Sequence, residues 1–456
     1  MFDSLLKGKI NWSIFIVVTG IIFLTPSLNI FAKFGLIITL HQFLLLYSSV
    51  NSILPIRYLF GFLMCIQMLF GPLLVYNWFS EYQSEIYRMQ IPQEDYLSYT
   101  LPVVICFLLG LHYNAGSYQG EVLNQEGLKE FIGKYPQLPY ILIIVGFAGT
   151  ILFALLPVYY GFIFTLVEDL KYIGVFILII VEKKLKPWPI VLVFGSIIST
   201  SLSQGLFHDL ITWVLFLGAI FCIKNKPNDL TKIISTIVFL LLILILQEIK
   251  GSYRNAIYHK GQETGLGTIT DTYKEQQGAG IFTDESIGPT LVRINQGFIL
   301  SYIMKNVPEN IPFQNGGEML EVLEAAIMPR VVDPNKLKAG DRQLFTQYSG
   351  LQLSESTSMA LGSPGDAYVN FGIVGGIVFM FFLGLTYNTI LKYFEKYKTT
   401  FPLIIVLSPL VFYYPIRPDC ELQTILGHLF KSIFFLYIIT FLFKKYISKK
   451  SDTQSS

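Results

Sequence analysis

Apolar segments of about 20 residues recur along almost the whole chain, and a helix needs about that length to cross a membrane. Only 14% of the 456 residues are charged and 53% are hydrophobic, whereas soluble domains carry roughly 25% charged residues. So few charges cannot cover the surface of a water-soluble protein of this length. The sequence therefore predicts an all-α polytopic membrane protein with about 12 transmembrane helices. They are expected near residues 11–28, 33–50, 57–78, 98–113, 138–157, 166–182, 188–205, 206–223, 230–248, 367–388, 400–416 and 422–443.

Lysine and arginine gather in alternate loops between these segments. Basic residues beside short loops are retained in the cytoplasm. All the basic loops fall on one side if both termini are cytoplasmic. Two termini on the same side of the membrane require an even number of helices. We expect helices one to nine in residues 1–248, helices ten to twelve in 367–443 and a basic cytoplasmic tail at 444–456. The net charge of +2 is too small to indicate a nucleic-acid partner.

One long loop, residues 249–366, separates the ninth predicted helix from the tenth on the outer side. Its aromatic and apolar content favours an ordered loop. Two stretches, from Asn295 to Met304 and from Gly317 to Met328, have the pattern of short helices. Long loops in a compact protein are usually functional or disordered. We therefore expect an ordered, functional external loop that carries short helices.

Cationic side chains gather at the predicted outer side. Arginine grips phosphate with a planar pair of donors and stays charged, so outer arginines around a membrane core suit a lipid-diphosphate substrate. Each arginine taken alone fits a solvated or ion-paired cation better, and Lys250 also fits a side chain that reaches the headgroups, so the interpretation depends on the group. The candidate binding residues are Lys250, Arg254, Arg293, Arg330, Arg342 and Arg417.

Acidic residues and one histidine near the same side are candidate proton acceptors. Asp366 follows a Pro-Gly pair at the start of the tenth helix, where it fits either a helix cap or a catalytic base. Glu421 and His428 lie on one polar stripe of the last helix, and Glu355 lies in the external loop. The choice among these four residues stays open. No Cys or His spacing indicates a metal site, so we expect neither a metal nor a cofactor.

Several runs resemble bacterial O-antigen and exopolysaccharide repeat-unit polymerases of the Wzy-like type. They are Lys250–Arg254, Ile294–Gly297, Val307–Pro308, Ile311–Phe313, Met328–Arg330 and Gly365–Gly372. The likeness covers roughly residues 245–385.

The resemblance implies a metal-independent membrane glycosyltransferase of the GT-C type in the bacterial cytoplasmic membrane. It would transfer a glycan from undecaprenyl diphosphate to the next lipid-linked repeat unit. The resemblance also implies that Tyr368 and Asn370 contact the substrate. The partners it implies are the lipid-linked oligosaccharide, membrane lipids, a chain-length regulator and a flippase.

Two other functions fit part of the same pattern. An O-antigen ligase-like enzyme would use the same donor with another acceptor, and the sequence does not separate the two enzymes. A transporter or flippase for lipid-linked oligosaccharides is the other alternative. Transporters favour binding sites at the membrane midplane, whereas the charges here gather at the outer side.

Overall fold

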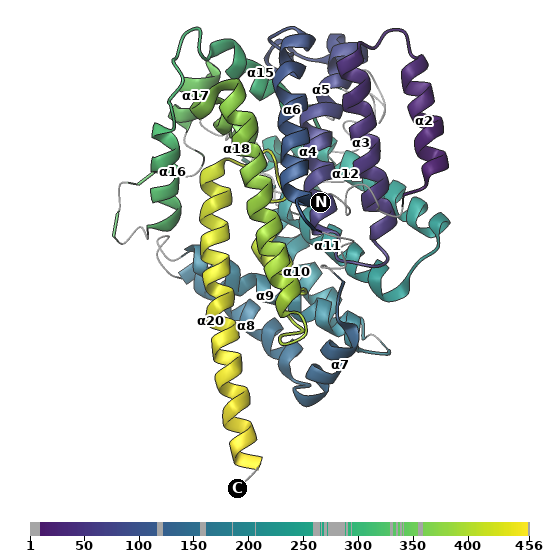
Figure 1. Cartoon of the computed structure of the whole chain (residues 1–456). Helices are drawn as coiled ribbons and strands as arrows, with labels where there is room; N and C mark the ends of the chain where they lie inside the picture. The colour runs from purple at the N-terminus through teal and green to yellow at the C-terminus, as the bar shows by residue number, and fades with distance from the viewer. Residues whose placement is uncertain are drawn as a thin grey trace.

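The protein is all-helical in the computed structural model, and its described residues contain no strand. Figure 1 shows one group of helices standing upright beside one another, with α20 running down to the C-terminus. This group consists of α2 (Trp12–Leu24), α3 (Ile30–Ser49), α4 (Ile56–Cys65), α5 (Gly71–Leu74), α6 (Gln93–His112), α18 (Gly362–Tyr397) and α20 (Leu422–Gln454). The structure describes residues 10–115, 122–155, 161–184, 186–205, 207–258, 294–328, 342–353 and 359–454, with short pieces between 265 and 292 and between 332 and 340.

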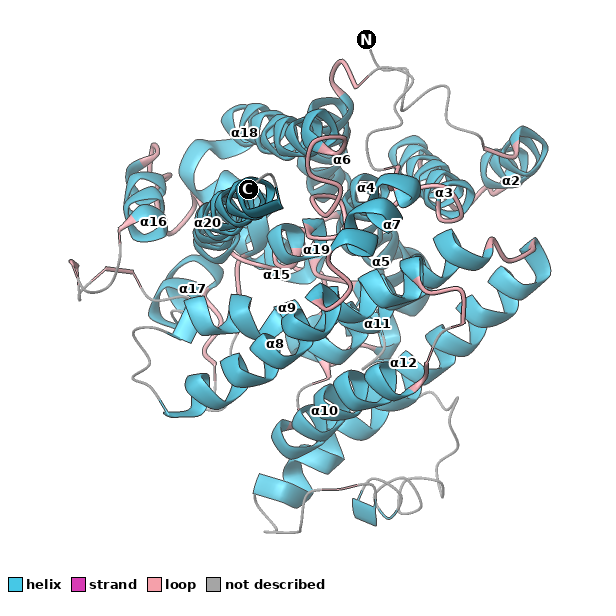
Figure 2. Ribbon diagram, turned by 90° about the horizontal axis from the view of Figure 1, so that it is seen from below, coloured by secondary structure: helices cyan, strands magenta, loops and turns pink. Residues whose placement is uncertain are grey.

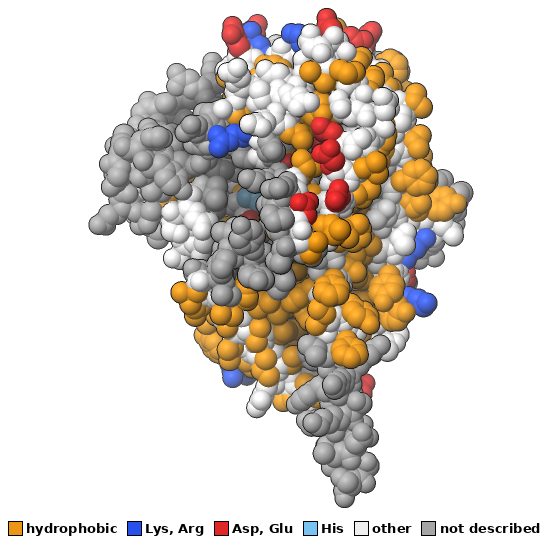
Figure 3. Space-filling view, turned by 90° about the vertical axis from the view of Figure 1, so that its left-hand side faces the viewer, with side chains coloured by type: hydrophobic (Ala, Val, Ile, Leu, Met, Phe, Trp, Pro, Cys, Tyr) orange, Lys and Arg blue, Asp and Glu red, His pale blue; other side chains and the backbone are white. Residues whose placement is uncertain are grey.

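Among the described residues, six helices are long and apolar enough to cross a membrane, and a bent pair could add a seventh. The exposed surface supports this assignment, because large hydrophobic side chains of α20 such as Phe434 and Tyr437 are about two thirds exposed (64% and 67%). Figure 3 shows a band of hydrophobic side chains over the lower half of the face that carries α16 and α20. The described chain therefore has the character of a multi-pass helical membrane protein. The six helices are Ile30–Ser49, Ile56–Phe79, Gln93–His112, His208–Asn225, Gly362–Tyr397 and Leu422–Phe441.

The helices α6 and α18 pack closely and run in parallel. Tyr99 donates a hydrogen bond to the carbonyl oxygen of Pro364 (2.8 Å) near the start of both helices. Further along, a Cβ atom at Gly110 would lie 2.0 Å from the carbonyl oxygen of Phe381, and one at Gly384 would lie 2.3 Å from that of Phe107. Only glycine allows two backbones to approach this closely, a common use of small residues between membrane helices.

A second group of helices crosses the upright ones. Figure 2 looks along α3 and α20, and in that view α8, α9, α10 and α12 extend across the picture. The residues of α9 from Ile173 to Ile180 are almost completely buried, as expected for a helix that is apolar on all sides. The second group consists of α7 (Gln125–Lys134), α8 (Leu138–Leu155), α9 (Gly161–Val181), α10 (Trp188–Gln204), α11 (His208–Asn225) and α12 (Asp229–Tyr258).

The span expected at residues 400–416 is not a continuous helix. It contains the five-residue helix α19 (Ser408–Phe412), and turns flank this helix on both sides. The segment includes Pro402, Pro409 and Pro415, and proline removes a backbone donor and clashes with the preceding turn. The segment is nonetheless almost entirely buried, so its apolar character reflects the protein core.

Several helix ends differ from the sequence-based boundaries, and α20 continues to Gln454, past the expected end of the last span at residue 443 and into the expected tail. The helix α12 continues to Tyr258, past the expected end of the ninth span at residue 248, and α18 begins at Gly362 instead of residue 367. Both short helices expected in the external loop are present, as α15 (Gly297–Asn306) and α16 (Gly317–Ile327), and α17 (Arg342–Ser349) joins them. In Figure 1 these three helices lie beside the upper end of α18.

Candidate functional site

The beginning of α18 is fastened to the turn that precedes α20. The backbone N–H of Ser363 donates to the carbonyl oxygen of Pro418 (3.2 Å). Gly362 has φ +75, and a Cβ atom there would lie 2.8 Å from the same oxygen. A residue with a side chain is strained at this φ and has no room. Gly362 therefore lets the two helix starts lie side by side.

The carboxyl group of Asp366 lies where these two helices meet. Its Oδ2 accepts a hydrogen bond from the backbone N–H of Leu422 (2.7 Å), the first residue of α20. The N-cap residue of α18 itself is Leu361. Asp366 is therefore a cap, but for the neighbouring helix, whose positive N-terminal end favours a nearby carboxylate. No residue that the structure describes donates a hydrogen bond to its other oxygen, Oδ1.

Two further carboxyl groups lie close to Asp366, and their charges act on it. Glu421 accepts hydrogen bonds from the backbone N–H of Gly340 and from the hydroxyl of Thr424, both at 2.8 Å. Glu318, on α16, accepts a hydrogen bond from the hydroxyl of Tyr348. Burial raises the pKa of Glu318, although the hydrogen bond from Tyr348 opposes that shift. The structure thus gathers three acids at the ends of α16, α18 and α20.

Tyr368 and Asn370 lie where the segment between α12 and α18 packs against α18. Asn370 accepts a hydrogen bond from the backbone N–H of Met319 (3.0 Å) and so caps α16. The buried Tyr368 packs its ring against that of Tyr99, with centroids 4.9 Å apart. At Gly372, φ is +65 and the helix is interrupted, which frees the carbonyl oxygens of residues 369 and 370 to bond the loop. A direct contact of these two side chains with substrate stays a prediction.

Arg417 is paired within the protein. Its Nη2 lies 3.2 Å from Oδ2 of Asp419, and its guanidinium lies 5.9 Å from the ring centre of Tyr414. Burial raises the pKa of Asp419, but Arg417 outweighs this effect and holds that pKa below its usual range. The Nε atom of Arg417 is buried without a hydrogen-bond partner. A phosphate group that bound Arg417 would therefore compete with Asp419.

A second polar cluster lies beside this turn, and it includes the His-Asp pair at residues 208 and 209, which is a weaker candidate from the sequence. Tyr413 donates a hydrogen bond to Asp209, at the start of α11, and stacks on Trp213 with centroids 5.6 Å apart. Asp169, on α9, is 7% exposed, and no described residue donates a hydrogen bond to it. The charges of Asp209 and of the neighbouring Glu168 act on Asp169. The available signal was the pair of acidic residues near the start of α9 and the His-Asp pair at residues 208 and 209.

The other candidate residues from the sequence do not belong to the cluster of acids around Asp366. His428 is buried two turns further along α20, where its Nε2 lies 2.6 Å from the carbonyl oxygen of Leu410. Arg342 is exposed at the start of α17. Glu355, Arg293 and Arg330 lie outside the described residues, as do the side chains of Lys250 and Arg254, whose backbones belong to α12.

The site as described can accept a proton and hold hydroxyl groups. Asp366 and Glu421 bring acceptor oxygens to one place, and the rings of Tyr99 and Tyr368 meet edge to face beside the start of α18. Within the described residues, no group of three or more His, Cys, Asp or Glu side chains is placed to hold a metal ion.

Comparison with protein-family models, characterised proteins and solved structures gave no match.

Proposed function

We propose that this protein polymerises undecaprenyl-diphosphate-linked oligosaccharide repeat units into O-antigen or exopolysaccharide at the outer face of the bacterial cytoplasmic membrane. The observation that carries the proposal is the Asp366 carboxyl group. It lies at the starts of two candidate membrane spans, with one oxygen fixed by Leu422 and the other open. In the proposed topology such a group lies at the membrane surface and is held in one orientation, as a general base must be.

The proposal includes a topology of twelve spans with cytoplasmic termini and an external loop at residues 249–366. Contacts at the opposite end of the upright helices support one part of it, the common side given to those ends of α4, α6 and α18. There Arg57 donates to Asn388 (2.9 Å), and Lys392 donates to the carbonyl oxygen of Tyr113 (3.0 Å). The sequence assigns these ends of α4, α6 and α18 to the cytoplasmic side. The starts of α6, α18 and α20 then face outward together.

In the proposed reaction a hydroxyl of the acceptor repeat unit attacks the anomeric carbon of the donor glycan. The new glycosidic bond forms while the bond from that carbon to the lipid diphosphate breaks, so undecaprenyl diphosphate leaves. Asp366, with Glu421 beside it, accepts the proton of the attacking hydroxyl. Fixed cations stabilise the charge on a leaving diphosphate, and the proposal gives this role to Lys250, Arg254, Arg293, Arg330, Arg342 and Arg417. The partners proposed are the lipid-linked oligosaccharide, a chain-length regulator and a flippase.

Reconstitution with a defined substrate tests this function. The purified protein in lipid vesicles is mixed with lipid-linked repeat units, and the products are separated by size. A ladder of longer lipid-linked glycans, with release of undecaprenyl diphosphate, is expected. Transfer only to an added lipid A core would identify a ligase. Movement of intact substrate across the bilayer without bond formation would identify a flippase, and either result would overturn the proposal.

A further inference from the structure

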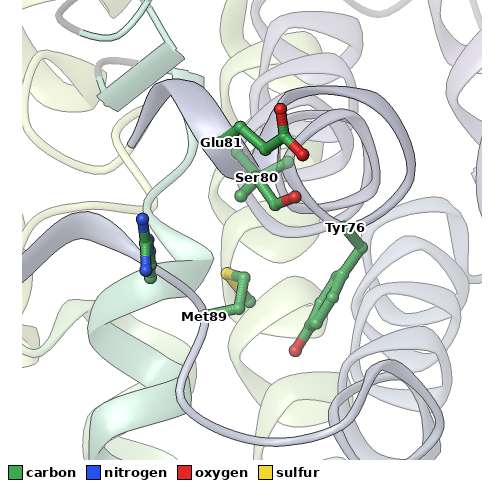
Figure 4. A pocket seen from close by; sticks show the side chains of 6 residues that line it. Tyr76, Ser80, Glu81 and Met89 are labelled. Carbon is green, nitrogen blue, oxygen red and sulfur yellow. The ribbon is translucent and has the colours of Figure 1, made fainter. Parts of the chain in front are cut away.

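A pocket of about 290 Å³ opens where the helical segment 56–79 ends. This segment contains two π-helical stretches, η1 (Ile66–Phe70) and η2 (Val75–Phe79), followed by the short 3₁₀ turns η3 (Ser80–Tyr82) and η4 (Glu85–Tyr87). π-helical turns often occur at functional sites. Figure 4 shows Ser80 and Glu81 on one side of the pocket, with Tyr76 and Met89 facing it from below. The lining residues are Val75, Tyr76, Ser80, Glu81, Arg88 and Met89.

Hydrogen bonds hold the walls of this pocket in place. The hydroxyl of Tyr76 donates to the carbonyl oxygen of Ile91 (2.7 Å), and Nε of Arg88 donates to that of Gln83 (3.1 Å). The backbone N–H of Gln90 donates to the hydroxyl of Ser301 on α15 (3.0 Å). The segment from Gln83 to Ile91 is thus fixed at several points, and these hydrogen bonds hold the pocket walls in place.

The pocket presents two opposite charges that are free to act on a ligand. Glu81 and Arg88 are exposed, and neither forms an ion pair with a residue that the structure describes. Glu81 can only accept hydrogen bonds when ionised, whereas the terminal nitrogens of Arg88 can only donate them. Val75 and Met89 add an apolar wall. A ligand that satisfies this lining carries donors and acceptors together, around a small apolar surface.

We propose that this pocket binds one pyranose residue of a glycan, as a sugar subsite separate from the Asp366 site. Sugar hydroxyls donate to a carboxylate and accept from a guanidinium, and the C–H face of the ring suits the apolar wall. The volume is at the small end of ligand pockets, which fits one ring and not a chain. A free phosphate fits less well, because Glu81 repels it.

This inference rests on the proposed function, which supplies the glycan. Contacts along α6 relate the position of the pocket to that of Asp366. The ring of Tyr76 lies 6.0 Å from that of Tyr96 on α6. One turn further along α6, Tyr99 bonds Pro364, two residues before Asp366. The pocket and the Asp366 site therefore lie at the same end of α6. One glycan chain could contact both, with the subsite holding a sugar away from the reacting bond.

Direct binding tests the subsite without any polymerisation. The full-length protein in detergent is titrated into the millimolar range with methyl pyranosides of glucose, galactose, mannose and their 2-acetamido analogues. Calorimetry measures binding, and tryptophan fluorescence, to which the partly exposed Trp78 of η2 contributes, supplies a second signal. At least one pyranoside is expected to bind saturably. Because charged hydrogen bonds are among the stronger ones, Glu81→Gln and Arg88→Gln should each weaken binding about tenfold or more.

The matched control is Glu85→Gln, which removes an exposed carboxylate four residues from Glu81 that does not line the pocket. It should leave the affinity unchanged. No saturable binding of any pyranoside, or equal affinities in the wild type and both pocket variants, would overturn the subsite. Stronger binding of inorganic phosphate or of glycine at the same residues would also overturn it, in favour of an anion or a zwitterion site. A protein that polymerises but binds no pyranoside would refute the subsite alone, whereas pyranoside binding without polymerisation would refute the proposed function alone.

Discussion

Replacement of Asp366 separates its structural role from a chemical one. Its Oδ2 accepts the N–H of Leu422 at 2.7 Å, a distance typical of a charge-assisted hydrogen bond. Asparagine can place its amide oxygen at the same point, and Asn and Asp are similarly good helix caps. A neutral hydrogen bond is weaker than a charged one by about 1 kcal/mol. Asp366→Asn should therefore cost about 1 kcal/mol of stability or less.

Asp366→Ala has a different expected effect. It removes the acceptor altogether and leaves the N–H of Leu422 without its partner at the start of α20. A donor left unsatisfied in this way costs about 1–3 kcal/mol. The alanine variant should therefore unfold at a clearly lower temperature than the asparagine variant.

The effect on rate is expected to follow another order. The amide of asparagine has no useful proton affinity and alanine has no polar group, so both variants lose the base. General base catalysis is typically worth roughly 10²–10⁴-fold in rate. Polymerisation is measured with purified lipid-linked repeat units, and stability is measured by thermal unfolding in the same detergent. Asp95→Asn is the control, because Asp95 is an exposed residue in the first turn of α6 at the same end of the molecule.

A near-normal rate for Asp366→Asn would refute the catalytic role and leave only the cap. The base would then have to be Glu421, Glu355 or His428. A stable but inactive asparagine variant, next to an active Asp95→Asn protein, would support the base. Inactivity together with a loss of stability as large as that of alanine would contradict the argument that asparagine preserves the cap.

Three further predictions concern other parts of the chain. Arg254→Ala should stop polymer formation in a normally inserted protein, and Lys should restore only part of it, since an ammonium lacks the paired donors of a guanidinium; a fully active alanine variant would remove Arg254 from the site. Gly110→Ala should sharply lower the yield of folded protein, because its Cβ would lie 2.0 Å from a carbonyl oxygen of α18, whereas Gly195→Ala, with open space around it, should not; equal yields by size-exclusion chromatography would contradict the close packing. Asp419→Asn should lower the unfolding temperature near pH 7, because the lowered pKa of Asp419 stabilises the fold only above the ordinary aspartate pKa of about 3.9. The difference should disappear as the pH falls through that value and below it, and a difference independent of pH would refute the role of this ion pair.

The sequence predicts those features of the fold that depend on local pattern. The periodicity of two loop segments predicts α15 and α16, whereas the Pro-Gly pair before Asp366, which suggests a helix start near residue 367, lies inside the first turn of α18. A hydropathy pattern does not distinguish a lipid-facing helix from one buried in protein. For that reason α9 and the segment at 400–416 have the same appearance in the sequence as the upright spans, although both are buried in the core. The count of twelve spans stays a prediction.

The candidate site is predicted in part, for a related reason. Glu421 and Asp366 are both recognisable as acids at helix starts, but the pairing of Asp366 with Leu422 joins residues that are far apart in the chain. The same is true of Asn370, which caps α16 from another helix. Asp169 and Asp209 meet beside Tyr413 only because α9 and α11 cross the upright group. No local spacing carries such information, and a single sequence supplies nothing else.

The structure changes the choice that the sequence leaves for Asp366. From the sequence, capping and catalysis exclude one another, because a residue at the start of its own helix would turn its carboxyl group back to that helix. Asp366 instead caps α20 from the second turn of α18, and it uses one oxygen for this purpose. The contact fixes the orientation of the carboxyl group, and Oδ1 receives no hydrogen bond from the described residues. A base requires a fixed position and an open lone pair. The hydrogen bond from Leu422 to Oδ2 fixes the position, and Oδ1 keeps the open lone pair. The rate of the asparagine variant, and not its stability, is therefore the measurement that decides the role of Asp366.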